Sequence, residues 1–435
     1  MTRGSSTGPR AVVATCVANA VEWYDFAVYG AMASILVVVV LPPGSGTTGL
    51  VAIFALFATS FLARPVGALY VGIRADRFGR RRALAAMILL MTGATAAIGL
   101  LLPWSAVGIA APACLVFLRL VQGFSSGGEI STSISFLVES VPRGRWGWCG
   151  GWHTATVALG LASGIAAAGV VTAVVPVDDL ETWGWRIPFL VALPLGLVGL
   201  YVRVRLDESP AFAAADVRGA PTLQGVWRSH AGVVRTGFVL VAVLAGTVNM
   251  WFVYLPTHLV SQHSHRLPVA LACAAAGLLA AAAAAPVLGS LSDRVGRRPI
   301  MAAATSTLCI LVVPLFFLAT QGTWITLLVA DLLVGVALGG MVISAHLAEC
   351  FPVTVRATGI GLTFGLATAL VGGTAPLVGS ILDARGLSIG IPLYLACWSA
   401  AGLAAVMRSP QKRSSGDDDR GSGPPHAPEA VTRNG

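Results

Sequence analysis

A stripe of polar side chains runs through residues 107–138, an otherwise apolar stretch of the chain. Spacings of 3, 4, 3 and 4 residues place its members on one narrow face of a helix: Arg119, Gln122, Ser126, Glu129 and Ser133. The guanidinium group of Arg119 matches the geometry of a carboxylate. Glu129 lies about 15 Å from Arg119 along a helix axis, which is too far for a direct ion pair. We predict that Arg119 and Gln122 bind a carboxylate ligand and that Glu129 binds a proton or pairs with another helix.

A second polar group interrupts the apolar stretch 13–41. Asn19, Glu22, Asp25 and Tyr29 fall on one broad face of a helix. Carboxyl groups inside an apolar helix are costly, and such groups indicate a functional site. We predict that Glu22 and Asp25 take up and release a proton and that Asn19 and Tyr29 contact the ligand. The alternative is a structural role, either near a helix end or as ion-pair partners of Arg119.

Two further side chains are predicted to contact the ligand. His153 lies in the apolar stretch 147–175, and imidazole gains and loses a proton in the physiological range. A buried histidine that only makes structural hydrogen bonds is the alternative. Tyr254 shares a helix face with Thr247 and His258.

The composition indicates which solvent surrounds these helices. The chain has 435 residues, of which 56% are hydrophobic and 11% charged. A soluble domain has about 25% charged residues, so lipid must cover much of this chain. The formal net charge is +9, but the basic residues stand between apolar runs, which argues against a nucleic-acid partner.

The apolar runs predict an all-α integral membrane protein. A bilayer-spanning helix needs about 20 mostly apolar residues. Twelve such runs are present: 13–41, 50–73, 83–102, 107–138, 147–175, 187–204, 233–259, 268–290, 299–319, 323–348, 357–382 and 389–407.

Arginine placement predicts the orientation of these spans. The loops that follow even-numbered spans hold sixteen arginines, whereas those that follow odd-numbered spans hold three. Positive residues favour the cytoplasmic side, so we predict a plasma-membrane protein with both termini in the cytoplasm. The predicted divisions are a cytoplasmic N-terminus, a six-helix half, a central cytoplasmic loop, a second six-helix half and a disordered cytoplasmic tail: 1–12, 13–204, 205–232, 233–407 and 408–435.

An internal repeat supports the division into halves. "GIRADRFGRRR" at 72–82 and "GSLSDRVGRRP" at 289–299 share one pattern, and Asp76 and Asp293 lie 217 residues apart. "ESVPRGR" and "ECFPVTVR" also recur, after spans 4 and 10. Two repeats about an axis normal to the membrane are typical of one class of transporters, which bind their substrate between the halves.

The repeated loop motif resembles the signature of the major facilitator superfamily. "ANAVEWYDFAVYG", "RLVQGFSSGGE" and "LAECFPVTVRATGIG" resemble, more narrowly, its metabolite:proton symporter family, whose members carry proline, betaine, α-ketoglutarate, citrate or shikimate. The resemblance implies that the Asp–Arg loops latch the two halves at the cytoplasmic rim. The predicted gating residues are Gly72, Asp76, Arg77, Gly79, Arg80, Gly289, Asp293, Arg294, Gly296 and Arg297. The alternative for the arginines is topology anchoring alone.

The expected function is proton-coupled uptake of a small organic acid or zwitterion by alternating access. The alternative is a proton-antiport exporter of a drug or secondary metabolite. An enzyme is not expected, because the chain has no cluster with catalytic or metal-ligand spacing. The chain has no P-loop, so we expect a proton gradient as the energy source and no cofactor. The expected partners are the lipid bilayer, the solute and the proton, and this fold typically works as a monomer.

Overall fold

The structure is a computed structural model that describes residues 8–78, 80–127, 133–135, 137–138, 141–204, 223–263, 265–353 and 355–409. Every regular element in these ranges is helical. The fold therefore satisfies its backbone hydrogen bonds within each helix, as a lipid environment requires.

The N-terminal half contains six spans, of which the first and the last are bent. Its elements are α1 (Gly8–Ala31), α2 (Ala33–Val40), α3 (Gly46–Phe78), α4 (Arg80–Gly99), α5 (Trp104–Val107), α6 (Ala110–Ser126), η1 (Arg143–Arg145), α8 (Trp146–Val174), α9 (Val177–Asp179), η2 (Leu180–Gly184) and α10 (Arg186–Val204). The axis turns by 63° between α1 and α2 and by 45° between η2 and α10.

The C-terminal half repeats this order. Its elements are α12 (Leu223–Thr247), η4 (Val248–Tyr254), α13 (Leu255–His263), α14 (Leu267–Val295), α15 (Arg297–Gln321), α16 (Trp324–Gly339), α17 (Ile343–Cys350), α18 (Arg356–Ala367), η5 (Thr368–Gly372), α19 (Ala375–Ala384) and α20 (Gly390–Arg408). The segments η4 and η5 are π-helical turns inside the first and the fifth span of this half. Such turns are frequent at functional sites.

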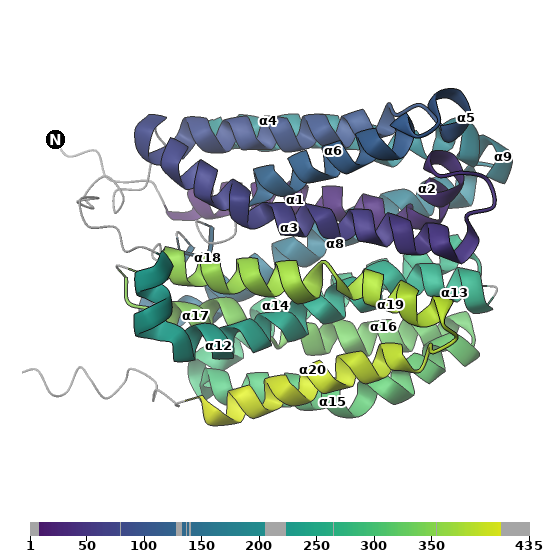
Figure 1. Ribbon diagram of the computed structural model, residues 1–435. Helices are drawn as coiled ribbons and strands as arrows, with labels where there is room; N and C mark the ends of the chain where they lie inside the picture. Colours follow the sequence, from purple (N-terminus) through teal and green to yellow (C-terminus); the bar gives the residue numbers. More distant parts are fainter. Residues whose placement is uncertain are drawn as a thin grey trace, which may run out of the picture.

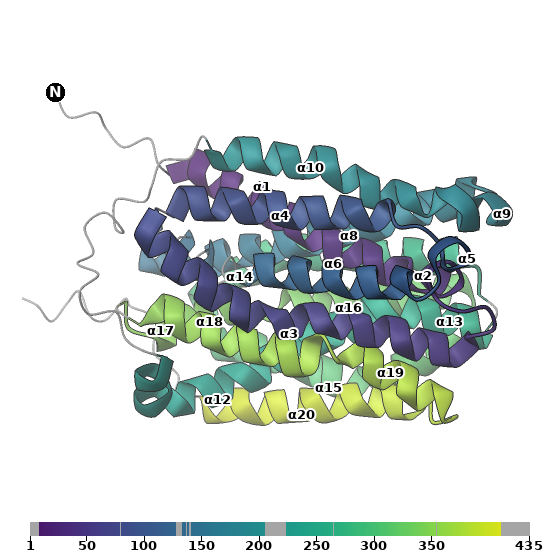
Figure 2. The same cartoon turned by 45° about the horizontal axis from the view of Figure 1, so that its top comes forward.

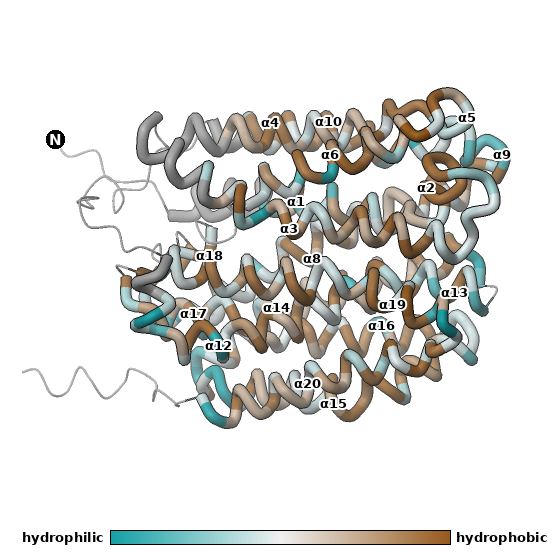
Figure 3. The backbone as a smooth tube through the Cα atoms, viewed as in Figure 1, coloured by the Kyte–Doolittle hydropathy of each residue, from teal (hydrophilic) through white to brown (hydrophobic). Residues whose placement is uncertain are grey.

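The twelve predicted spans are present. Eight continuous stretches of the described residues are long and apolar enough to cross a bilayer, and two bent pairs supply further spans. Two shorter apolar helices, Ala85–Gly99 and Ala110–Ser126, complete the set. The tube in Figure 3 is hydrophobic along these helices, and hydrophilic segments gather toward the two ends of the bundle. Many side chains on the outer surface are leucine, valine or isoleucine, which matches contact with lipid tails.

The two halves lie side by side with parallel helix directions, as Figures 1 and 2 show. Their main contact is made by α8 of the N-terminal half and α14 of the C-terminal half. Glycines allow this approach, because a side chain on Gly147 or Gly151 would meet the backbone of α14. We call the end of the bundle with Gly147 and Asp293 the Asp293 end. The opposite end, with α13 and the end of α19, is the Asp383 end (Figure 1).

Candidate functional site

Arg119 is completely buried in the N-terminal half. Its guanidinium carbon lies 3.9 Å from the ring centre of Tyr29 on α1 and 5.1 Å from that of Phe57 on α3. Arg119 Nη1 donates a hydrogen bond of 2.9 Å to Gln122 Oε1, so the predicted shared face of these two residues is present. Arg119 Nε and Nη2 have no hydrogen-bond partner among the described residues. One edge of the guanidinium group is therefore buried with its two donors unpaired among the described residues, and we call it the open edge of Arg119.

A chain of hydrogen bonds leads from Arg119 to a buried acid. Gln122 Nε2 donates to Thr95 Oγ1 at 2.6 Å, and Thr95 Oγ1 lies 2.8 Å from Asp25 Oδ2, to which it donates. The second oxygen, Asp25 Oδ1, has no hydrogen-bond partner among the described residues. We call Arg119, Gln122, Thr95 and Asp25 the Arg119 relay. Thr95 lies on α4 and was not predicted, because an isolated threonine in an apolar run gives no signal of its contacts.

The structure does not support the alternative in which Glu22 is the ion-pair partner of Arg119. Glu22 Oε1 lies 4.0 Å from Arg64 Nη2 on α3, and both side chains are buried. The Arg64 guanidinium also lies over the rings of Phe26 and Phe61, at 4.4 Å from each centre. Glu22 pairs with Arg64 because α3 places this arginine on the side of α1 that carries Glu22. For Asp25 the structure gives a link to Arg119 through two intervening side chains.

Of the remaining predicted residues of the N-terminal half, Tyr29 contacts Arg119 of the relay and Asn19 contacts α8. Asn19 Nδ2 donates to Thr156 Oγ1 of α8 at 2.9 Å. His153 is buried one turn before Thr156, and its Nε2 has no hydrogen-bond partner among the described residues. Glu129 lies outside the described residues. Tyr29 places its ring against Arg119 and donates its hydroxyl to the Ile53 carbonyl.

Tyr254 has a partner that the sequence did not reveal. Its hydroxyl donates to Asp383 Oδ2 of α19, and its ring packs edge-on against Phe54 of the N-terminal half, 5.3 Å between centres. His258 Nδ1 lies 2.5 Å from the same carboxylate oxygen. Asp383 falls one residue beyond the predicted span 357–382, where an acid reads as part of a loop. Its role therefore required the tertiary structure.

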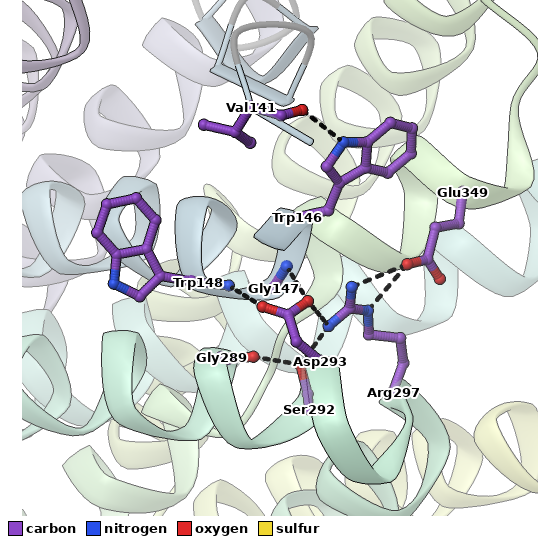
Figure 4. A network of polar contacts seen from close by, with 9 residues as sticks. All are labelled: Val141, Trp146, Gly147, Trp148, Gly289, Ser292, Asp293, Arg297 and Glu349. Carbon is purple, nitrogen blue, oxygen red and sulfur yellow. Dashed lines mark hydrogen bonds and ion pairs between the residues drawn. The ribbon is translucent and has the colours of Figure 1, made fainter. Parts of the chain in front are cut away.

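The second copy of the loop motif connects the two halves at the Asp293 end (Figure 4). Asp293 Oδ1 and Oδ2 accept hydrogen bonds from the backbone N–H groups of Gly147 and Trp148, both at 2.8 Å. Asp293 thus caps the N-terminus of α8, a helix of the other half, where the helix dipole favours a carboxylate.

Arg297 joins this cap to a second acid. Its Nη1 lies 2.7 Å from Asp293 Oδ1, and its Nη2 lies 2.9 Å from Glu349 Oε1. Gly289 approaches the backbone of Gly147, and Gly296 ends α14 with a φ of 96°, which favours glycine. Arg294 is exposed at the rim. In the first copy of the motif, Gly72 lies in the helical backbone of α3. Gly79 lies outside the described residues. The side chains of Asp76, Arg77 and Arg80 also lie outside them.

Comparison with known proteins agrees with this arrangement. The sequence model of the Major Facilitator Superfamily matches residues 15–376 and 267–429. The chain is 33% identical over 417 residues to an ectoine/proline transporter of Corynebacterium glutamicum, covering 91% of this chain and 83% of the relative. It is 30% identical to the alpha-ketoglutarate permease of Escherichia coli K12, covering 88% and 90%.

A solved structure shows the same fold. The proton:xylose symporter XylE, bound to 6-bromo-6-deoxy-D-glucose, superposes with a TM-score of 0.74 at 17% sequence identity and covers 92% of this chain and 96% of its own. At this identity the likeness concerns the fold. The repeated motifs, the twelve spans and these relatives agree. The protein is a multi-pass membrane transport protein rather than an enzyme, and the chain belongs to the Major Facilitator Superfamily, within its metabolite:proton symporter family.

Proposed function

We propose that this protein is a proton-coupled symporter that imports a small zwitterion or organic acid across the plasma membrane. The observation that carries the proposal is the Arg119 relay, in which a buried arginine with an open edge is linked to a buried acid with an open oxygen. A buried charge without a satisfied partner is costly and indicates a ligand site.

The open edge of Arg119 suits a carboxylate. Nε and Nη2 are the two donors of a side-on guanidinium fork, which binds both oxygens of a carboxylate through parallel hydrogen bonds. The aromatic rings of Tyr29 and Phe57 hold the guanidinium plane in place from α1 and α3. A substrate carboxylate would therefore meet a preorganised site rather than a flexible side chain.

The same relay supplies a reason for coupling substrate to proton. While Arg119 is empty, its positive charge stabilises a negative Asp25 inside the low-dielectric bundle. A bound substrate carboxylate neutralises Arg119, and an ionised Asp25 would then be a buried, uncompensated charge. Binding of the substrate thus favours binding of a proton at Asp25, which makes the two travel together. Glu22 has a cationic partner in Arg64, so we place the coupling proton at Asp25 in preference to Glu22.

Among substrate classes, a zwitterion has the most support. A relative with 33% identity is named for ectoine and proline, and the relay offers the cation of Arg119 for the carboxylate of such a solute. Alternating access would proceed by rocking of the two halves. The contacts of Asp293 with α8 would close the Asp293 end. The arginine distribution supports the proposal that this end and both termini lie in the cytoplasm. We propose that the protein works as a monomer with the proton gradient as its energy source.

The experiment is uptake of labelled proline, betaine, ectoine and α-ketoglutarate into proteoliposomes under an inward proton gradient. We expect one or more solutes to accumulate and the accumulation to collapse with a protonophore. Asp25→Asn should abolish gradient-driven accumulation while exchange of internal for external substrate continues. If the inserted protein accumulates none of the panel, or if Asp25→Asn accumulates substrate like the parent, the proposal is wrong.

A further inference from the structure

A group of ionisable side chains in the C-terminal half has no part in the Arg119 relay. Asp383 Oδ2 accepts the Tyr254 hydroxyl and contacts His258 Nδ1, and Asp383 Oδ1 accepts the Ser388 hydroxyl at 2.7 Å. His258 is fully buried, and the Asp383 side chain is 5% exposed. The group joins α13 to α19 at the Asp383 end.

The hydrogen bonds of Asp383 favour one protonation state of the group, in which the carboxyl is ionised. Hydroxyl groups donate to both oxygens of Asp383, and a carboxylate with donors on all sides is satisfied in its ionised form. His258 Nδ1 must then carry the hydrogen that it directs to Asp383. This leaves Nε2 as the basic nitrogen of the ring, and Nε2 is buried with no hydrogen-bond partner among the described residues. The group holds a net charge of −1 and an open position for one proton.

Among the described residues, the titratable groups in contact with His258 are Tyr254 of η4, His263 of α13, 5.2 Å away between ring centres, and Asp383 of α19. His265, just beyond α13, lies near His263. The helix α15 presents Phe316 to His258, at 5.5 Å between ring centres. With Asp383 as the nearest charge, a proton on Nε2 would make the His258–Asp383 pair neutral.

The group also touches the boundary between the halves. Tyr254 donates to Asp383 with its hydroxyl and packs its ring against Phe54 on α3. If the two halves move apart at the Asp383 end, the ring of Tyr254 separates from the ring of Phe54. Water would then reach the buried edge of His258.

We propose that His258 and Asp383 form a proton-binding site in the C-terminal half, which exchanges its proton when the Asp383 end is open. The inference rests on the proposed proton coupling and adds a second site to it. A proton from water binds to Nε2, the Nδ1–H bond to Asp383 remains, and the net charge of the group changes from −1 to zero. A neutral group is cheaper to enclose in apolar surroundings than a single negative charge, so protonation favours closure of this end.

The first test needs no substrate. Histidine labelled with ¹⁵N in the full-length protein, inserted in lipid nanodiscs, is titrated by NMR from about pH 5 to 9, the range in which imidazole changes charge. We expect one histidine whose Nε2 signal titrates while its Nδ1 stays protonated. His258→Gln should remove this signal, and Asp383→Asn should change its midpoint.

His346 provides a matched control, since it lies at the other end of the same half with its Nε2 3.3 Å from the Ser409 hydroxyl. His346→Gln should leave the His258 signal unchanged. A His258 signal that does not titrate in this range, or whose midpoint is the same in Asp383→Asn, would overturn the proposal.

The second test uses transport of whichever panel solute the parent protein carries. His258→Gln should lower gradient-driven uptake about 10-fold, since an uncharged amide cannot take up the proton, and should keep substrate exchange within about 2-fold. His346→Gln should match the parent in both assays. Parent-like gradient-driven uptake by His258→Gln would count against the site. If the parent carries no solute, the proposed function fails, and the NMR titration still decides whether His258 binds a proton.

Discussion

Arg119 in the N-terminal half and Asp331 in the C-terminal half stand at matching positions of α6 and α16. Each precedes by four residues a glycine that packs on the backbone of the neighbouring helix, Gly123 on Ser60 and Gly335 on Gly277. Both are buried beside an aromatic side chain of the first span of their own half. The same scaffold thus carries opposite charges.

The two positions differ in how far their polar atoms are satisfied. Asp331 Oδ1 accepts the indole N–H of Trp251 at 2.7 Å. Arg119 has two donors without a partner among the described residues. One turn after the matching glycines, Gly127 packs on Arg64, whereas Gly339 packs on Ala281. A duplicated framework can therefore hold unpaired donors at this position in one half and a hydrogen-bonded carboxylate in the other. The framework determines the backbone packing, and a few side chains determine the charge.

The largest expected effect concerns Arg64. Arg64→Met leaves Glu22 without its arginine, and loss of one partner of a buried ion pair costs about 3–5 kcal/mol of folding free energy. Thermal unfolding in detergent should show a much lower Tm, and the double variant Arg64→Met/Glu22→Gln should recover most of it. If Arg64→Met has the same Tm as the parent, the Arg64–Glu22 pair does not stabilise the fold.

The next prediction compares the uptake of variants at Arg119 and at Asp331. Arg119→Lys keeps the charge but loses the fork, and uptake per inserted protein should fall about 100-fold. Asp331→Asn keeps an oxygen that can accept from Trp251, so uptake should stay within about 3-fold of the parent. Equal losses in the two variants would mean that both halves bind the substrate through these positions, contrary to the comparison.

A smaller effect tests the shared scaffold. Gly123→Ala and Gly335→Ala each place a methyl group against a backbone, and each should lower the unfolding free energy by about 1–3 kcal/mol. Gly93→Ala on α4 is the control, because a methyl group there meets nothing within 4 Å. It should be neutral or stabilise by up to about 1 kcal/mol. Chemical denaturation measures all three, and a stable Gly123→Ala would contradict the close packing of α6 on α3.

The smallest effect concerns the hydrogen-bond donors. Thr95→Val removes the link between Gln122 and Asp25, at a cost of about 1–3 kcal/mol for the groups left unpaired. Uptake should fall about 10-fold, and its pH dependence should change because Asp25 loses its donor. Trp251→Phe removes the corresponding donor of Asp331 and should leave the pH dependence unaltered. If uptake by Thr95→Val has the same pH dependence as uptake by the parent, Asp25 does not act through the Arg119 relay.

The parts of the site that lie within one helix followed from spacing. Arg119 and Gln122 were expected on one face, and they hydrogen-bond to each other. The pairings between helices did not follow. Glu22 meets Arg64, Asp25 meets Thr95, and His258 meets Asp383 across 125 residues of sequence. Helical periodicity gives the direction of a side chain but not the identity of the helix that packs against it.

The sequence by itself determined the membrane environment, the twelve spans, their duplication and the family. It did so because a bilayer requires long apolar helices, and because a repeated loop motif is visible in the residues themselves. Only the tertiary structure decided which buried charges are compensated and which are open. That outcome depends on hydrogen bonds of about 3 Å between distant segments, and these form only when the helices are packed.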